Sequence, residues 1–305
     1  MPSIFTSLTA VERLAAHATV LPADFGRALG EDLEYGRFGA ALAELPQFGG
    51  WAMGLNQLVV FPKRTRFSTL FREVAPVAFG LKAAELVANG ALVGTEAGLA
   101  FVAGWFTQVC VARALDPLER ALSMRHHGVD ESVESARLRI EWVQSLFLMQ
   151  ELHGNELLGS PLIRRKLQLR KANTPKGIGR GLYELIRVAS QEALEEAPSK
   201  STVDGWMRGL FVFSLAVGTP AGRLKALREA SRPQLRELYR SSGVDVWPAV
   251  ESGLHQTREV LTALSSMILR GNFSSRAKAR VLALATDTEE ITDPRGNEVS
   301  DGSAR

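Results

Sequence analysis

The stretch Ala97–Leu122, AGLAFVAGWFTQVCVARALDPLERAL, decides the fold. Its first part is almost entirely apolar, which predicts a buried helix that begins near Thr95 and ends at Leu115. The Asp-Pro pair at Asp116 and Pro117 predicts a break there. A second helix is expected to begin after it, because proline is well tolerated in a first helical turn. The rest of the chain is expected to pack around this segment.

Composition places the chain among soluble globular proteins. It has 305 residues, of which 46% are hydrophobic and 23% are charged, and this is enough for a sizeable core. The net charge of +3 is too small to favour nucleic acid as a partner. A single cysteine, Cys110, excludes an intramolecular disulfide and therefore a disulfide-built secreted scaffold. The start of the chain does not read as a secretory signal, and charges and glycines interrupt every apolar span, so we expect a cytoplasmic protein without a transmembrane segment.

Long 3.6-residue periodicities and scarce strand signals predict an all-α, multi-helix bundle. We expect one domain over residues 1–285, with subdivision near 172–176 left open, and a disordered acidic tail over 286–305. Residues 36–51 are rich in Gly and Pro and predict a loop. Pro76 must kink or restart the helix expected over residues 66–89. The other expected helices are 7–19, 23–35, 131–153, 161–171, 179–196, 202–217, 221–229, 233–241, 247–269 and 274–285.

The central stretch contains a recognisable frame of six residues. They are Ala100, Phe101, Gly104, Trp105, Thr107 and Pro117. In this spacing the stretch resembles the bacterial zinc-dependent phospholipase C family, all-helical metallohydrolases in which His, Asp and Glu side chains hold a cluster of zinc ions. The frame in that family carries a His, an Asp and a His as metal ligands. This chain has Gln108, Ala112 and Asp116 at those positions.

The resemblance extends loosely over about the first 172 residues, and most of the other matched ligands are also replaced. Ser7 stands for a His in the opening PSIFTS, and Glu44 stands for an Asp in ELPQF. Arg72 stands for a His in a weaker third match. In a later segment, Arg137 and Glu141 stand for the pattern His-x-x-x-Glu, so Glu141 is the one acid kept in type.

These replacements leave three acids, Glu44, Asp116 and Glu141, that are able to bind a cation. Arg137 brings a permanent positive charge to the place where zinc would lie. We expect it to pair with Glu141 one turn away, or with Glu44 or Asp116, because an unpaired buried charge is costly. The favoured interpretation is a former metal pocket held by Arg–carboxylate pairs. The alternatives are a zinc site with altered ligands, and three acids that share no site.

The segment Ser160–Arg180 contains no acid and is strongly basic. Its candidate residues for binding an anionic surface are Arg164, Arg165, Lys166, Arg170 and Lys171. Leucines alternate with these charges, and such an amphipathic pattern is typical of helices that bind phosphate groups or anionic membranes. The alternative is a solvated face that docks its leucines on the core.

Three functions follow from these patterns. The first is a non-catalytic protein on a phospholipase C-like scaffold, which binds a protein or an anionic surface and needs no cofactor. The second is an active metal-dependent phospholipase C or phosphodiesterase with a rebuilt zinc site. The third is a self-associating structural protein, so the possibility of a homo-oligomer is left open.

Overall fold

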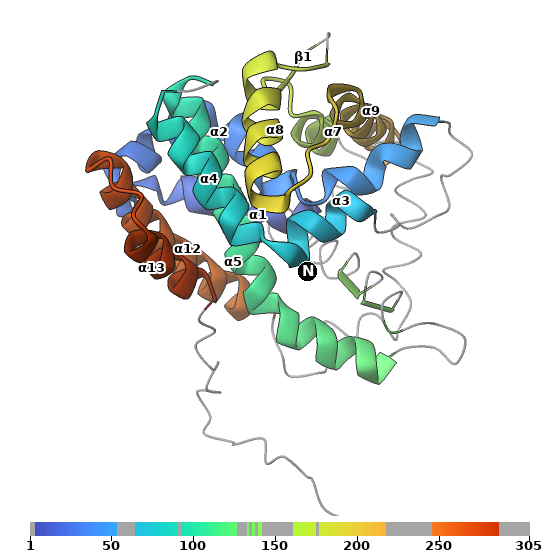
Figure 1. Cartoon of the computed structure of the whole chain (residues 1–305). Helices are drawn as coiled ribbons and strands as arrows, with labels where there is room; N and C mark the ends of the chain where they lie inside the picture. Colours follow the sequence, from blue (N-terminus) through green and yellow to red (C-terminus); the bar gives the residue numbers. More distant parts are fainter. Residues whose placement is uncertain are drawn as a thin grey trace, which may run out of the picture.

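The protein is all-α in the computed structural model (Figure 1). The structure describes residues 4–53, 65–90, 93–126, 133, 136–137, 140–141, 161–174, 177–217 and 246–286. The α-helices are α1 (Ile4–Ala16), α2 (Ala23–Ala41), α3 (Arg66–Thr69), α4 (Pro76–Ala88), α5 (Thr95–His126), α7 (Pro161–Gln168), α8 (Arg180–Leu194), α9 (Lys200–Val217), α12 (Val246–Leu269) and α13 (Ser275–Thr286). The 3-10 helices Ala18–Val20 and Leu45–Met53 and the π-helix Leu70–Val74 join them. A minimal antiparallel ladder pairs β1 (Asn173–Thr174) with β2 (Gly177–Ile178).

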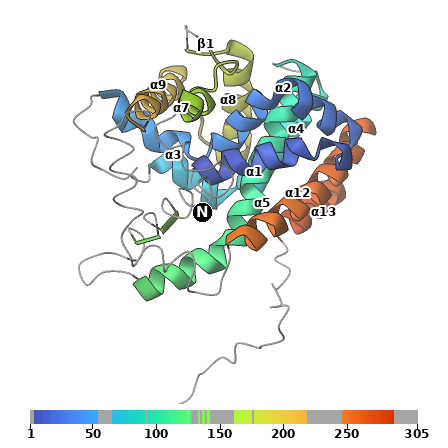
Figure 2. The ribbon, with the colours of Figure 1, turned by 180° about the vertical axis from the view of Figure 1, so that it is seen from behind.

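Helix α5 lies at the centre and packs against α1, α2, α4, α12 and α13 (Figures 1 and 2). The predicted break after Leu115 is wrong, because α5 continues through Pro117 to His126. Proline inside a helix removes one hydrogen bond and costs about 3 kcal/mol. Leu115, Leu118 and Leu122 are all buried along this part of α5, and their burial offsets that cost.

The backbones of α2 and α5 are in direct contact where the two helices cross. A Cβ added to Gly104 would lie 1.8 Å from the Gly36 carbonyl oxygen, and one added to Gly39 would lie 2.1 Å from that of Phe101. The loop predicted over residues 36–51 is therefore wrong. Its glycines permit close helix packing instead of turns, so α2 continues to Ala41 and a 3-10 helix follows.

Trp105 anchors α4 to α5. Its indole Nε1 donates a hydrogen bond of 2.8 Å to the Pro76 carbonyl oxygen, and its ring lies 4.4 Å from the Phe79 ring and 5.8 Å from that of Phe71, measured between centroids. The predicted restart at Pro76 is confirmed, since Ala75 has non-helical dihedral angles and α4 begins at Pro76. The Gly-Trp pair of the central stretch thus serves core packing.

Several other predictions are settled by the described residues. The helices expected over 179–196, 202–217, 247–269 and 274–285 are confirmed as α8, α9, α12 and α13. Those expected over 221–229 and 233–241, most of 131–153 and the tail after residue 286 lie outside the described residues. Among the described residues, the helix Thr95–Met124 is long and apolar enough to cross a membrane by length and composition, a test that buried core helices also pass. Because 94% of its apolar window is buried, it also has the character of a core helix in a soluble protein.

Candidate functional site

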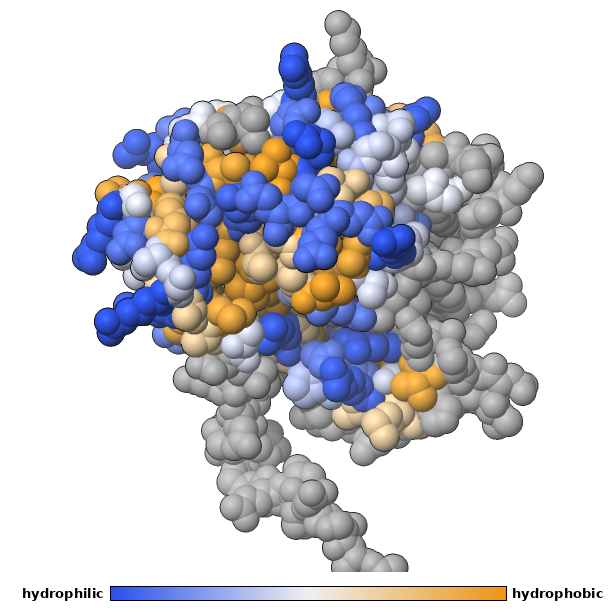
Figure 3. All heavy atoms as spheres, in the orientation of Figure 1, coloured by the Kyte–Doolittle hydropathy of each residue, from blue (hydrophilic) through white to orange (hydrophobic). Residues whose placement is uncertain are grey.

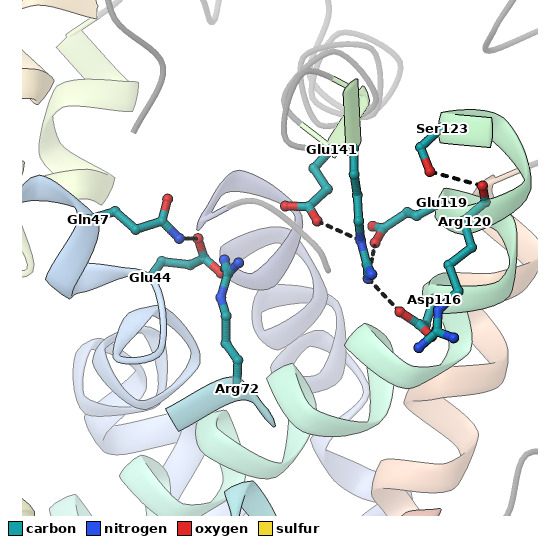
Figure 4. A network of polar contacts seen from close by, with 9 residues as sticks. Glu44, Gln47, Arg72, Asp116, Glu119, Arg120, Ser123 and Glu141 are labelled. Carbon is teal, nitrogen blue, oxygen red and sulfur yellow. Dashed lines mark hydrogen bonds and ion pairs between the residues drawn. The ribbon is translucent and has the colours of Figure 1, made fainter. Parts of the chain in front are cut away.

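The guanidinium of Arg137 lies among the carboxylates of Asp116, Glu119 and Glu141. Figure 4 labels these three acids. The Nη2 atom of Arg137 contacts Asp116 and lies 3.2 Å from Glu119 Oε2, and its Nε lies 3.3 Å from Glu141 Oε1. Asp116 and Glu119 are neighbours one turn apart on α5. The predicted pairing of Arg137 with Asp116 and Glu141 is confirmed.

The three acids are buried to different extents. The side chain of Glu119 is fully buried and that of Glu141 is 3% exposed, whereas that of Asp116 is 29% exposed. Asp116 Oδ2 also forms an ion pair of 2.7 Å with Nε of Arg120, a side chain that is mostly exposed. The cluster thus extends from solvent at Arg120 to the interior at Glu119. Burial of a carboxylate is tolerable only with such charge and hydrogen-bond compensation.

A second buried ion pair joins Arg72 to Glu44. Both side chains are almost completely buried, and the Gln47 amide donates a hydrogen bond of 2.8 Å to the other Glu44 oxygen. Arg72 belongs to the π-helix Leu70–Val74, the wider turn of which comes directly before the break at Ala75. Short π-helices are frequent at functional sites. Here the π-helix supplies the inward-pointing cation.

Electrostatic interactions connect the Arg72–Glu44 pair to Arg137 and its carboxylates. Burial lowers the pKa of the Arg72 guanidinium; the nearby Glu141 carboxylate opposes this shift, and the Arg137 charge adds to it. Charges act on each other more strongly in a low-dielectric interior than in water. Glu44, Arg72, Arg137 and Glu141 therefore form one buried charge cluster together with Asp116 and Glu119. Below it is called the arginine–carboxylate cluster.

The remaining predicted site positions lie in the core without a described contact to this cluster. Ser7 on α1 and Gln108 on α5 are buried, and their side-chain polar atoms have no hydrogen-bond partner within the described ranges. Ala112 is buried on α5. Because Gln108, Ala112 and Asp116 recur every four residues, they share one face of α5. Asp116 alone of these three reaches an arginine in the part of the chain that is described.

Sequence reasoning missed one member of the cluster, Glu119, and the partner of another, Arg72. Glu119 went unnoticed because a helix break was expected at Pro117; in a continuous helix it lies one turn from Asp116 on the same face. Arg72 had a weak signal, its alignment with a family histidine, but its partner Glu44 was not foreseen. Nothing in the local sequence indicates the π-helix that orients Arg72.

The donor set does not fit a zinc centre. Among the described residues, no group of three or more His, Cys, Asp or Glu side chains is arranged to hold a metal ion. Zinc sites use thiolate, imidazole and carboxylate donors around a tetrahedral ion. In this cluster the carboxylates instead direct their oxygens at guanidinium groups. A divalent ion would have to displace Arg137 and lie beside its charge.

Part of the basic segment is engaged within the molecule. Lys166 Nζ lies 2.5 Å from Glu12 of α1, and Lys171 Nζ lies 3.2 Å from Asp32 of α2. Leu167 and Leu169 are buried, as the docking interpretation requires. Arg170 hydrogen-bonds Gln168, Arg165 is exposed, and the side chain of Arg164 lies outside the described part. Two of the five predicted anion-binding residues thus already have acidic partners.

Comparisons with models of known families, with curated proteins and with solved structures find no match. The resemblance to zinc-dependent phospholipases therefore depends on the sequence frame alone, and the functional argument depends on the geometry of Arg137 and its carboxylates.

Proposed function

We propose that this is a non-catalytic binding protein built on a scaffold that resembles zinc-dependent phospholipase C. In this proposal two arginines, Arg72 and Arg137, supply the positive charge that metal ions provide in that family. The observation that carries the proposal is the position of Arg137 among Asp116, Glu119 and Glu141. We place its action in the cytoplasm and assign it no cofactor.

Physical chemistry supports the loss of hydrolysis. A catalytic zinc ion needs an open coordination position and a bound water with a pKa lowered to about 7. A guanidinium has no such position and cannot be deprotonated in a protein, so it neither activates water nor accepts a proton. It does neutralise buried carboxylates. The cluster therefore holds α5 to the segment that carries Glu141, as the metal would in an enzyme, without providing a nucleophile.

The test is hydrolysis of a chromogenic phosphocholine ester by the full chain with added zinc and with a chelator. We expect no turnover above a blank in either condition. Chelator-sensitive turnover would instead establish the alternative, an active metal-dependent phosphodiesterase. A variant that restores the family ligands, Ser7→His, Gln108→His, Ala112→Asp, Asp116→His and Arg137→His, serves as a comparison. The resemblance implies that this variant acquires zinc affinity that the parent lacks.

Self-association is the remaining alternative. Static light scattering over a wide concentration range separates it from the proposal. A mass that stays at one chain contradicts a structural role through self-assembly. A mass that rises with concentration supports such a role and directs the search for a partner to the chain itself.

A further inference from the structure

The α12–α13 hairpin forms an edge of the molecule in both ribbon views (Figures 1 and 2). Residues 260–286 of this hairpin contain four basic residues and no acidic residue. Lys278 is used within the fold, since its Nζ lies 3.0 Å from Glu85 of α4. The other three, Arg270, Arg276 and Arg280, are exposed and have no ion pair within the described part of the chain.

Two apolar side chains of the hairpin are also exposed. Leu269, the last residue of α12, is 79% exposed, and Leu282 of α13 is 48% exposed. Arg276 and Arg280 are one turn apart on α13, so they share a face. Figure 3 shows hydrophobic and hydrophilic residues side by side over the part of the surface where α12 and α13 lie. Asp24 of α2, which α12 contacts, accepts a hydrogen bond of 3.0 Å from Ser265.

We propose that the tip of the α12–α13 hairpin binds an anionic lipid surface, with Leu269 entering the interface and Arg270, Arg276 and Arg280 contacting lipid phosphates. This inference rests on the binding role proposed above and assigns that role to the hairpin, in place of the Ser160–Arg180 segment expected from the sequence. Each basic residue near an anionic membrane is worth about 1 kcal/mol, and an exposed leucine adds apolar burial. A nucleic acid partner would use the arginines but would leave Leu269 in water.

The first experiment is sedimentation of the full chain with vesicles of phosphatidylcholine alone and with added phosphatidylglycerol. We expect binding only to the anionic vesicles, and weaker binding at high ionic strength. Arg276→Gln/Arg280→Gln should weaken partitioning roughly 25-fold, at about fivefold per charge. The control Arg165→Gln/Arg170→Gln removes equal charge from the basic segment and should leave partitioning nearly unchanged.

The second experiment follows insertion of the tip. Leu269→Cys can be labelled selectively with an environment-sensitive dye, because Cys110 is buried and burial raises the pKa of its thiol to about 12. Anionic vesicles should shift the emission of this dye to the blue. The same dye on Ser201→Cys, an exposed position on α9, should show no shift.

Three outcomes would overturn the inference. They are no binding to anionic vesicles at low ionic strength, loss of binding with the control pair instead of the hairpin pair, and hairpin-dependent binding of duplex nucleic acid without vesicle binding. Failure of the proposed function is read separately, from hydrolysis and zinc content. If the chain binds vesicles and also hydrolyses the ester, only the proposed function is contradicted. If the chain neither hydrolyses the ester nor binds vesicles, only this inference is contradicted.

Discussion

The Nη2 atom of Arg137 lies 3.2 Å from Oε2 of Glu119, a carboxylate with a side chain that has no exposed surface. The same guanidinium reaches Asp116 and Glu141. All three acids therefore share the charge of this one side chain. This dependence makes Arg137 the residue at which the account is most easily tested.

Replacing Arg137 with methionine should destabilise the fold by about 3–5 kcal/mol, because it leaves buried carboxylates without their shared counter-charge. Urea denaturation of the full chain measures the loss. The matched control is Arg120→Met, which removes an arginine that is 70% exposed and that, among the described residues, forms an ion pair with Asp116. That change should cost less than about 1 kcal/mol. Equal effects of the two variants would contradict the geometry described for Arg137.

Gly104→Ala should destabilise the protein by more than about 3 kcal/mol or prevent folding, because the new methyl group would meet the Gly36 carbonyl oxygen. Helices α2 and α5 would have to separate along their whole contact. Gly30→Ala is the control on α2, since no atom lies within 4 Å of its added Cβ. We expect this change to raise the unfolding free energy by up to about 1 kcal/mol, through better helix propensity.

Stability should fall in acid through the Glu85–Lys278 contact between α4 and α13. Burial of Glu85 opposes ionisation, but the hydrogen bond and charge of Lys278 and the charge of Lys82 hold the pKa of its carboxyl below the ordinary value. A lowered folded-state pKa contributes stability above the unfolded value near 4.5, and this is lost as the pH falls through the folded-state pKa. Denaturation at a series of pH values should show a smaller acid loss in Glu85→Gln than in the parent.

Cys110 should resist thiol reagents in the folded protein. Its burial raises the pKa of the thiol to about 12, so almost no thiolate is present at neutral pH. Labelling with an aromatic disulfide reagent should follow the unfolding rate, and should become fast in denaturant. Rapid labelling without denaturant would show that α5 is accessible where the structure buries it.

Much of the helical layout could be predicted from periodicity, because α8, α9, α12 and α13 each carry a regular apolar face. Pro76 was a dependable signal since a residue before proline disfavours helix. The helix break predicted at Pro117 was wrong because buried leucines on both sides of it stabilise a continuous α5. This stabilisation comes from tertiary packing, which the local sequence does not show. The glycines around Gly36 misled for the same reason, as their role appears only when α5 is placed against them.

The candidate site was predictable in part. The spacing of Arg137 and Glu141 is local, so their pairing followed from helix geometry. The Arg72–Glu44 pair joins distant segments through a π-helix, and no local pattern specifies it. Placement of Lys166 and Lys171 against acids of α1 and α2 was likewise a matter of long-range packing.

Zinc content of the purified full chain tests the central claim most directly. The protein would be incubated with excess zinc, dialysed and analysed for metal per chain by mass spectrometry. The account predicts no stoichiometric zinc, because Arg137 and Arg72 already neutralise the carboxylates. Two or three zinc ions retained per chain would contradict it.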